Sequence, residues 1–345
     1  MKQIKLFKPY VSWRAIWNTV GVLRSGQLAE GPQVRAFERE FGVMFGFEDV
    51  VSLNSGTSAL ELAYELADIG EGDEVISPVL TAVATNVPLV RRKAKIIFAD
   101  TEEDLNMSVV DVKRKITPRT KAIVFVHFNG NNRGLDELVA LCAEKKIMLI
   151  EDAAQAVGSD NWGKGDFVCM SFQAIKTFTT GDGGALLCKD KLLAQKARRL
   201  RWFGFDRSRG QSSDIAEAGY KYHMNDIAAA IGRGNLHSLP KVIAHRKRLM
   251  EEYKAHGVPA FIWRAFVLSD KRDELQKALV GQGVHAAVYD NRNDTHSLFG
   301  GKQALPVMDV LENKYLILPL HMGVSIANVK QICAIIMQFN EIHKS

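Results

Sequence analysis

Long apolar runs are missing from this 345-residue chain, and its first residues lack the pattern expected of a secretory leader. Its longest apolar runs, at residues 121–128 and 147–150, are far shorter than the ~20 residues that a membrane-spanning helix needs, so we expect no membrane span. Residues 1–13 contain lysines but no continuous apolar block and no small-residue cleavage site, which argues against a secretory signal. We therefore expect a cytoplasmic protein.

Paired cysteines are also missing. Cys142, Cys169, Cys188 and Cys333 are widely spaced, form no CxxC pair and lie in apolar surroundings. Metal sites need closely spaced ligands, and a disulfide framework needs an oxidising compartment. We predict four buried free thiols and no metal site.

A separate basic arm is missing as well, although the formal net charge is +6. Lysine and arginine are spread along the chain apart from short clusters at residues 198–201 and 245–248, and no helix-turn-helix signature is visible. We expect a basic surface that favours anionic substrates and no nucleic-acid partner. A nucleic-acid binder or a non-catalytic regulator is the competing hypothesis from a different class.

What the chain does contain is a regular alternation of strand-like and helical segments. Short β-branched runs at residues 50–53, 74–77, 95–98, 121–126 and 147–151 alternate with amphipathic stretches at 57–69, 81–91, 109–115 and 135–145. Two further strand-like runs, 167–172 and 184–188, follow without an intervening helix. This βαβ rhythm predicts an α/β domain whose mostly parallel sheet is flanked by helices on both faces.

After residue 225 the pattern changes. Helical patterns cover residues 226–236 and 240–256, and Pro240 fits a helix start. Strand-like runs at 260–268 and 284–288 alternate with helical patterns at 273–282 and 326–342. We predict a large domain over residues 1–240, which includes the N-terminal segment, and a smaller α+β domain over residues 241–345. The helix near residues 240–256 is the expected bridge between them.

Ligands of an open parallel sheet bind beyond the carboxyl ends of its strands, so the residues there are the first candidates for a site. The first strand leads through Asn54 and Ser55 into Gly56, Thr57 and Ser58 at the start of a helix. Small residues let an anion approach the backbone, and the free N–H groups of a first helical turn can bind phosphate. The alternative is an ordinary helix cap.

Two further strand ends carry an acid and a lysine. Asp152 follows a buried strand, and Gln155 comes three residues later, among small residues that leave room for a flat ring. An aspartate there can keep a pyridine nitrogen protonated, or it can cap a helix. Ser171 and Lys176 precede a glycine-rich turn between two apolar strands. A lysine in that setting can lose its hydration and become a nucleophile.

These motifs, taken in this order, are far more specific than any one of them. The chain resembles the DegT/DnrJ/EryC1/StrS family of pyridoxal-phosphate-dependent sugar aminotransferases, which have the aspartate-aminotransferase fold (fold type I). The resemblance covers nearly the whole chain. The matching stretches are KPY at residue 8, SGQLAEGP at 25, NSGTSAL at 54, GDEVISP at 72, TPRTKAI at 117, EDAAQA at 151, SFQAIKTFTTGDGG at 171, GYKYHMNDIAAAIG at 219 and LPLH at 318.

The resemblance assigns a role to each candidate residue of the site. Lys176 would form the Schiff base with pyridoxal 5'-phosphate and then move protons as general base and acid. Asp152 would pair with the pyridine nitrogen and strengthen the electron sink, and Gln155 would contact the cofactor's ring or its hydroxyl. The phosphate would lie against the turn formed by Gly56, Thr57 and Ser58, with Ser171 alongside.

The resemblance also implies a homodimer with two shared sites. In this family the segment that matches residues 219–226 reaches the other subunit, which would place Lys221 on the partner's cofactor phosphate. The chain departs from the common pattern at Lys221 and His223, where relatives have Asn and Arg, and at Ala82, where many relatives have an aromatic residue that stacks on the pyridine ring. Segments 158–166 and 253–267 are shorter than in most relatives.

The reaction implied by the family is transamination. Glutamate would give its amino group to the cofactor, which would pass it to a keto-deoxyhexose on a nucleotide, giving a nucleotide-linked amino sugar. The resemblance leaves open whether carbon 3 or carbon 4 is aminated, which nucleotide is carried and which pathway takes the product. A sugar dehydratase of the same family is the alternative within the family. Lys176 argues against it, because those relatives have histidine at this position.

Two weaker candidates complete the list. His127 ends a strand at the ligand-facing edge and is either a substrate contact or a structural hydrogen-bonding residue. Tyr289, Asp290, Asn291 and Arg292 follow a strand of the smaller domain, and either face the substrate or form a solvated turn.

Overall fold

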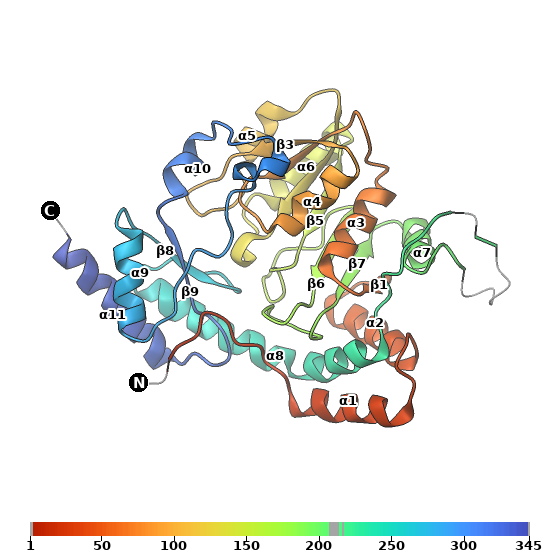
Figure 1. Cartoon of the computed structure of the whole chain (residues 1–345), viewed down its shortest axis with the longest axis horizontal. Coiled ribbons are helices and arrows are strands. Elements are labelled where there is room, and N and C mark those ends of the chain that lie inside the picture. Colours follow the sequence, from red (N-terminus) through yellow and green to blue (C-terminus); the bar gives the residue numbers. More distant parts are fainter. Residues whose placement is uncertain (1–2, 207–213, 216, 344–345) are drawn as a thin grey trace.

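A seven-stranded sheet is the centre of the computed structural model, which describes residues 3–206, 214–215 and 217–343 (Figure 1). Its strands are β1 (Val50–Leu53), β2 (Glu74–Pro78), β3 (Lys95–Ala99), β4 (Thr120–Val126), β5 (Met148–Asp152), β6 (Phe167–Ser171) and β7 (Gly184–Cys188). In space they follow the order β1-β7-β6-β5-β4-β2-β3. β7 is antiparallel to β1 and β6, and the other neighbouring pairs are parallel. The predicted mostly parallel sheet is confirmed.

Helices cover both faces of this sheet, because successive side chains of a strand point to opposite faces. On β4, Ala122 and Val124 pack into one core, while Ile123 and Phe125 pack into another. The first face is covered by α3 (Gly56–Leu66), α4 (Val83–Arg91) and α7 (Lys191–Leu200). The other face is covered by α2 (Pro32–Phe45), α5 (Val109–Lys115) and α6 (Leu135–Lys145). The sheet is therefore the middle layer of three.

A second, two-stranded sheet lies toward the C-terminus. It pairs β8 (Ala265–Leu268) with β9 (Tyr315–Leu318) in antiparallel fashion. It packs with α9 (Arg272–Gly281), α11 (Ile326–Ile342) and the end of α8 in a core of its own, and α10 (Pro306–Leu311) lies in a neighbouring cluster. The strand predicted from residue 260 begins only at 265, because residues 259–264 form a turn in which Phe266 N–H bonds to the Pro259 carbonyl. The run 284–288 makes isolated bridges to Ile4 and Ile317 instead of a strand.

One continuous helix joins the two parts. α8 (Asp226–Ala255) has 30 residues and includes Pro240, so the two separate helices predicted on either side of that proline were wrong. At ~1.5 Å per residue it is about 45 Å long. It contacts α1 (Trp13–Ser25) and α2 at one end and α11 at the other, as Figure 1 shows. The predicted domain boundary at residue 240 falls inside this helix.

The two helices at the N-terminus carried no sequence prediction. α1 begins after Ser12, whose hydroxyl caps Ala15 N–H. The carboxylate that caps α2 comes from a distant part of the chain: Asp226 accepts the N–H groups of Gly31, Gln33 and Val34. This cap lies nearly 200 residues away and leaves no local signature, so the only local signal for the start of α2 is Pro32 at its first position.

The predicted free thiols are confirmed for all four cysteines, of which Cys142, Cys169 and Cys333 are buried and Cys188 is half-buried. Of the helices in the described residues, none combines the length and the apolar character that crossing a bilayer requires.

Candidate functional site

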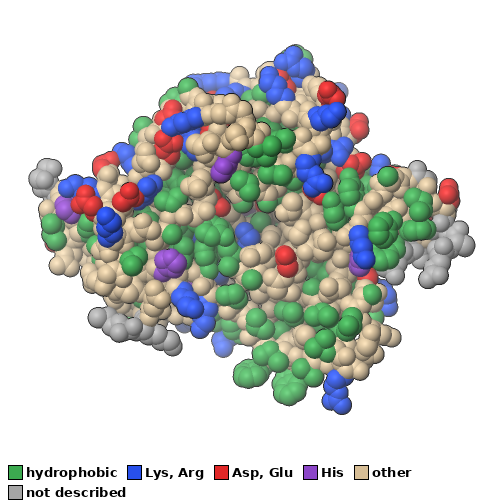
Figure 2. All heavy atoms as spheres, viewed as in Figure 1, with side chains coloured by type: hydrophobic (Ala, Val, Ile, Leu, Met, Phe, Trp, Pro, Cys, Tyr) green, Lys and Arg blue, Asp and Glu red, His purple; other side chains and the backbone are tan. Residues whose placement is uncertain are grey.

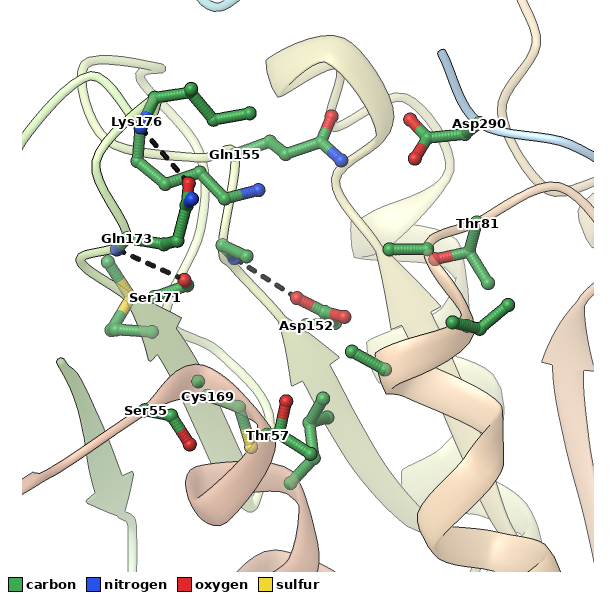
Figure 3. Close-up of a pocket in the computed structure, with 18 of the residues that line it drawn as sticks. Ser55, Thr57, Thr81, Asp152, Gln155, Cys169, Ser171, Gln173, Lys176 and Asp290 are labelled. Carbon is green, nitrogen blue, oxygen red and sulfur yellow. Dashed lines mark hydrogen bonds between the residues drawn. The ribbon is translucent and has the colours of Figure 1, made fainter. Parts of the chain in front are cut away.

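A cavity of about 590 Å³ opens at the carboxyl ends of β5 and β6 (Figure 3). Its walls come from distant parts of the chain. The strand ends, helix starts and the turn after β6 contribute Ser55, Gly56, Thr57, Thr81, Ala82, Asp152, Gln155, Ser171 and Lys176. The segments on either side of the turn η3 (Asn293–Thr295) contribute Tyr289, Asp290, Asn291 and His296. The first group is named the sheet wall here, and the second the small-sheet wall. A cavity of this size suits a cofactor with part of a substrate.

Asp152 is the acid at the base of the cavity. It ends β5, and its side chain is 6% exposed. One carboxylate oxygen accepts the Thr85 hydroxyl at 2.8 Å and the other accepts Ala154 N–H at 3.1 Å. The Thr85 hydroxyl is itself 2.9 Å from that of Thr81. These two donors hold the carboxylate in one orientation.

The neighbouring Glu151 points to the opposite face of the same strand. Its carboxylate lies 2.8 Å from His127 Nε2, and both side chains are fully buried. It also accepts backbone N–H groups, among them those of Gly163 and Gly165. Burial alone would raise the pKa of Glu151, but the hydrogen bonds from His127 and the backbone outweigh it and leave that pKa below its usual value. His127 thus makes a structural hydrogen bond and does not line the cavity.

Lys176 projects into the cavity from the turn between β6 and β7. Figure 3 shows its side chain directed into the same space as those of Asp152 and Gln155. Burial lowers the pKa of the Lys176 amine from 10.5 to about 8, against the opposing influence of the Asp290 and Asp152 carboxylates. A buried amine with this pKa is partly neutral near physiological pH, which is the form that attacks a carbonyl carbon.

Gln155 has its amide orientation fixed by its surroundings. Its Oε1 accepts Asn129 N–H at 2.6 Å and Arg264 Nη2 at 3.3 Å. Since the oxygen is occupied by two donors, the amide nitrogen is left to face the cavity as a donor. The backbone here is close-packed: Gly130 has φ +86°, and a Cβ there would lie 2.4 Å from Ile262. Only glycine fits that turn.

The start of α3 forms an anion cradle. The first N–H groups of a helix have no acceptor within the helix, and here the Ser55 hydroxyl takes only that of Ser58, at 3.0 Å. The N–H groups of Gly56 and Thr57 are left for a ligand. A Cβ at Gly56 would lie 2.7 Å from the Ser171 Cβ, so glycine lets the Ser171 hydroxyl lie beside the cradle. The residues present therefore fit the phosphate of pyridoxal phosphate.

Six of the eight residues predicted to bind the cofactor meet in this cavity, and two do not. Gly56, Thr57, Asp152, Gln155, Ser171 and Lys176 line it. Ser58 lies in the first turn of α3, where its hydroxyl is bonded to Asn54 and Ser55. Lys221 is exposed outside the cavity of its own chain, in a bridge with Trp202. Ala82 lines the cavity and presents no aromatic ring.

For the small-sheet wall, the sequence either left the role of a residue open or gave no indication of it. Tyr289, Asp290 and Asn291 line the cavity, whereas Arg292 is buried in ion pairs with acidic groups that include Asp294. Behind this wall Arg264 bonds to Asp290 at 2.8 Å, and both side chains are almost completely buried. One signal for Arg264 was available: an arginine inside the apolar run 261–266 needs a buried partner.

Comparisons with known proteins agree with this geometry. A model of the DegT/DnrJ/EryC1/StrS aminotransferase family matches residues 14–337. The dTDP-4-dehydro-2,3,6-trideoxy-D-glucose 4-aminotransferase of Saccharopolyspora spinosa is 30% identical, over 95% of this chain and 94% of its own. Among solved structures, AtS13 from Actinomadura melliaura superposes with a TM-score of 0.91 at 32% identity, covering 98% of this chain and 99% of its own. The sugar aminotransferase CalS13 from Micromonospora echinospora gives 0.90 at 29% identity, covering 97% and 99%.

Family, fold and site therefore agree. The match spans nearly the whole chain, the neighbouring structures share the three-layer architecture, and an acid, a lysine and an anion cradle meet in one cavity. The chain belongs to the DegT/DnrJ/EryC1/StrS aminotransferase family and is a pyridoxal-phosphate-dependent sugar aminotransferase.

Proposed function

We propose that this enzyme transfers the amino group of glutamate to the keto carbon of a nucleotide-linked keto-deoxyhexose. The observation that carries the proposal is Lys176, whose amine has a pKa of about 8 and faces the same cavity as Asp152. The Saccharopolyspora spinosa relative acts, by its name, on a dTDP-linked keto-deoxy sugar, which supports this class of acceptor. Carbon 3 and carbon 4 both remain candidates for amination.

The cavity provides a contact for each part of the cofactor. Pyridoxal phosphate supplies an aldehyde that takes up the amino group and a ring that delocalises electrons. The N–H groups of Gly56 and Thr57 would bind its phosphate beside Ser171, and Asp152 would accept the ring N–H. Gln155 would offer its amide N–H to the ring hydroxyl oxygen, since its own oxygen is already occupied.

Lys176 would serve first as the covalent anchor and then as the acid and base. A group that both takes and gives a proton works best when its pKa is close to the operating pH. The desolvated Lys176 amine meets that requirement, with a pKa of about 8 instead of 10.5. The Thr85 hydroxyl and Ala154 N–H fix the orientation of the Asp152 carboxylate, which would face the ring nitrogen.

The same proposal includes a homodimer with shared sites. An exposed apolar patch covers α1, where Trp13 is 76%, Trp17 68% and Leu23 55% exposed. In Figure 2, apolar side chains gather at the lower edge of the molecule, which is where Figure 1 shows α1. Contiguous exposed apolar surface on a folded chain is typical of an interface. Lys221 lies outside its own cavity, which supports a role at the phosphate of the partner's cofactor.

The absorbance spectrum of the purified protein tests the first half-reaction. We expect a visible band from the lysine-bound cofactor, and its loss when glutamate is added. The glutamate-treated protein, freed of excess glutamate, is then mixed with dTDP-linked 3-keto and 4-keto deoxyhexoses. Mass spectrometry should show an amino group in place of one keto group. A stable band in the presence of glutamate, or no aminated sugar from either acceptor, would refute the proposal.

A further inference from the structure

The Lys176 amine rests on an aromatic ring. Its Nζ lies 4.3 Å from the centroid of the Trp263 indole. Within the residues that the structure describes, Nζ makes no hydrogen bond and no ion pair, although the Asp152 and Asp290 carboxylates are close enough to influence its pKa. The indole face is thus in direct contact with the amine.

Trp263 is held rigidly in this position. The side chain is 2% exposed, and its Nε1 donates to the Ile175 carbonyl, one residue before the lysine, at 3.4 Å. Its backbone N–H donates to the Asn129 carbonyl at 3.0 Å, and its own carbonyl accepts Arg246 Nη1 at 3.0 Å. These contacts fix the ring relative to the lysine turn, the segment after β4 and α8.

A second cation shares the ring. The Arg264 guanidinium carbon lies 3.9 Å from the Trp263 centroid, and Asp290 neutralises this arginine at 2.8 Å. Arg264 therefore takes the Asp290 carboxylate that would otherwise be free to bind the lysine. A cation attracted to a ring face is held more weakly than one in a buried ion pair. The ring therefore holds the Lys176 amine in place without a buried ion pair that would keep the amine protonated.

We propose that Trp263 is a positioning residue for Lys176: it seats the amine whenever the lysine is not bonded to the cofactor, within reach of the cofactor's aldehyde carbon. The inference rests on the proposed function, in which that bond opens and closes in every cycle. When the bond forms, the neutral amine bonds to the aldehyde carbon and the aldehyde oxygen leaves as water. Arg264 acts through the indole and through Asp290, and touches neither reacting atom.

The test compares the apoproteins of the parent, Trp263→Phe and Trp263→Leu. Each is mixed with pyridoxal phosphate, and the rate at which the visible band of the lysine-bound cofactor appears is measured at pH 7.5. Trp162→Leu is the matched control, because Trp162 packs on Phe45 and Phe47 away from the cavity. The affinity for pyridoxamine phosphate is measured in parallel, since this form has no aldehyde and does not bond to the lysine.

We expect Trp263→Leu to form the band about tenfold more slowly, because without the ring the neutral amine is held less often in the orientation that faces the cavity. Trp263→Phe, which keeps a ring, should stay within about threefold of the parent, and Trp162→Leu should match it. Pyridoxamine phosphate affinity should change less than about twofold in all variants. A parent-like rate in Trp263→Leu, or a parallel fall in pyridoxamine phosphate affinity, would overturn the proposal. If the parent itself forms no band, the proposed function fails instead.

Discussion

The two walls of the cavity are built on different principles. In the sheet wall, Asp152 ends a strand, Gly56 begins a helix, and Lys176 follows in the turn after β6, so the backbone topology itself delivers them to one edge. In the small-sheet wall, Asp290 is held by the buried Arg264, and behind this wall Trp263 is fixed by bonds to three other segments. The first wall carries the groups that we propose to react, and the second surrounds them. Candidate reactive residues can thus be identified from their positions at strand ends. The burial and the charged neighbours of such a residue depend on tertiary packing.

The sharpest test of the sheet wall is Lys176→Ala. Removing the anchor and the proton carrier together should lower turnover by at least about a thousandfold, because acid–base catalysis alone contributes up to ~10⁴. The circular dichroism spectrum should stay unchanged. Lys189→Ala, at an exposed lysine directly after β7, is the control. Transamination near the parent rate would show that the lysine is not the reactive group.

Asp152→Ala should have the next largest effect. It would leave the cationic ring nitrogen without its buried partner, a loss of ~3–5 kcal/mol, so turnover should fall at least ~100-fold. The exposed Asp160→Ala serves as the control for loss of a carboxylate. A reduction of only a few-fold would mean that a residue other than Asp152 holds the pyridine ring. The sheet wall would then not supply the acid of the site.

Lys221→Ala tests whether the second chain of a dimer contributes Lys221 to the cavity. Losing a charge-assisted phosphate contact of ~1.5–3 kcal/mol should weaken cofactor retention roughly ten- to a hundredfold. Mixing this variant with Lys176→Ala, under conditions that let subunits exchange, should restore up to about half of the parent activity per mixed dimer. One site would then hold both lesions, and the other neither.

The outcome of that mixing experiment is decisive only when exchange is demonstrated, for instance by native mass spectrometry of differently tagged chains. If each variant alone is inactive and the mixture also stays inactive after exchange, Lys221 acts in the site of its own chain. The cavity would in that case be complete without a partner.

The pH dependence of cofactor attachment tests the influence of the small-sheet wall. With a pKa of about 8, about a tenth of Lys176 is neutral at pH 7 and about nine tenths at pH 9, so the apoprotein should bond to pyridoxal phosphate about tenfold faster at pH 9. Because the Asp290 carboxylate raises this pKa, Asp290→Asn should move the midpoint to lower pH. A midpoint near 10.5 in the parent would show that the lysine is hydrated and that this wall does not desolvate it.

Much of the sheet wall was determined by the sequence itself. The period of the apolar runs located the strands of the central sheet, and the ends of parallel strands must meet at one edge, so Asp152, Ser171 and Lys176 had to lie near one another. The ranges predicted for the helices Val109–Lys115, Leu135–Lys145 and Ile326–Ile342 agree with the structure. Local periodicity and strand polarity are properties of short segments, which is why the sequence contains them.

Only the tertiary structure decided the rest. The cap of α2 by Asp226, the continuity of α8 through Pro240, and the place of Trp263 against Lys176 each join segments that are far apart or override a local preference. Sequence reasoning offered two roles for His127, and its bond to Glu151 selected one of them. Contacts of this kind depend on how helices and sheets pack, and no short-range pattern records them.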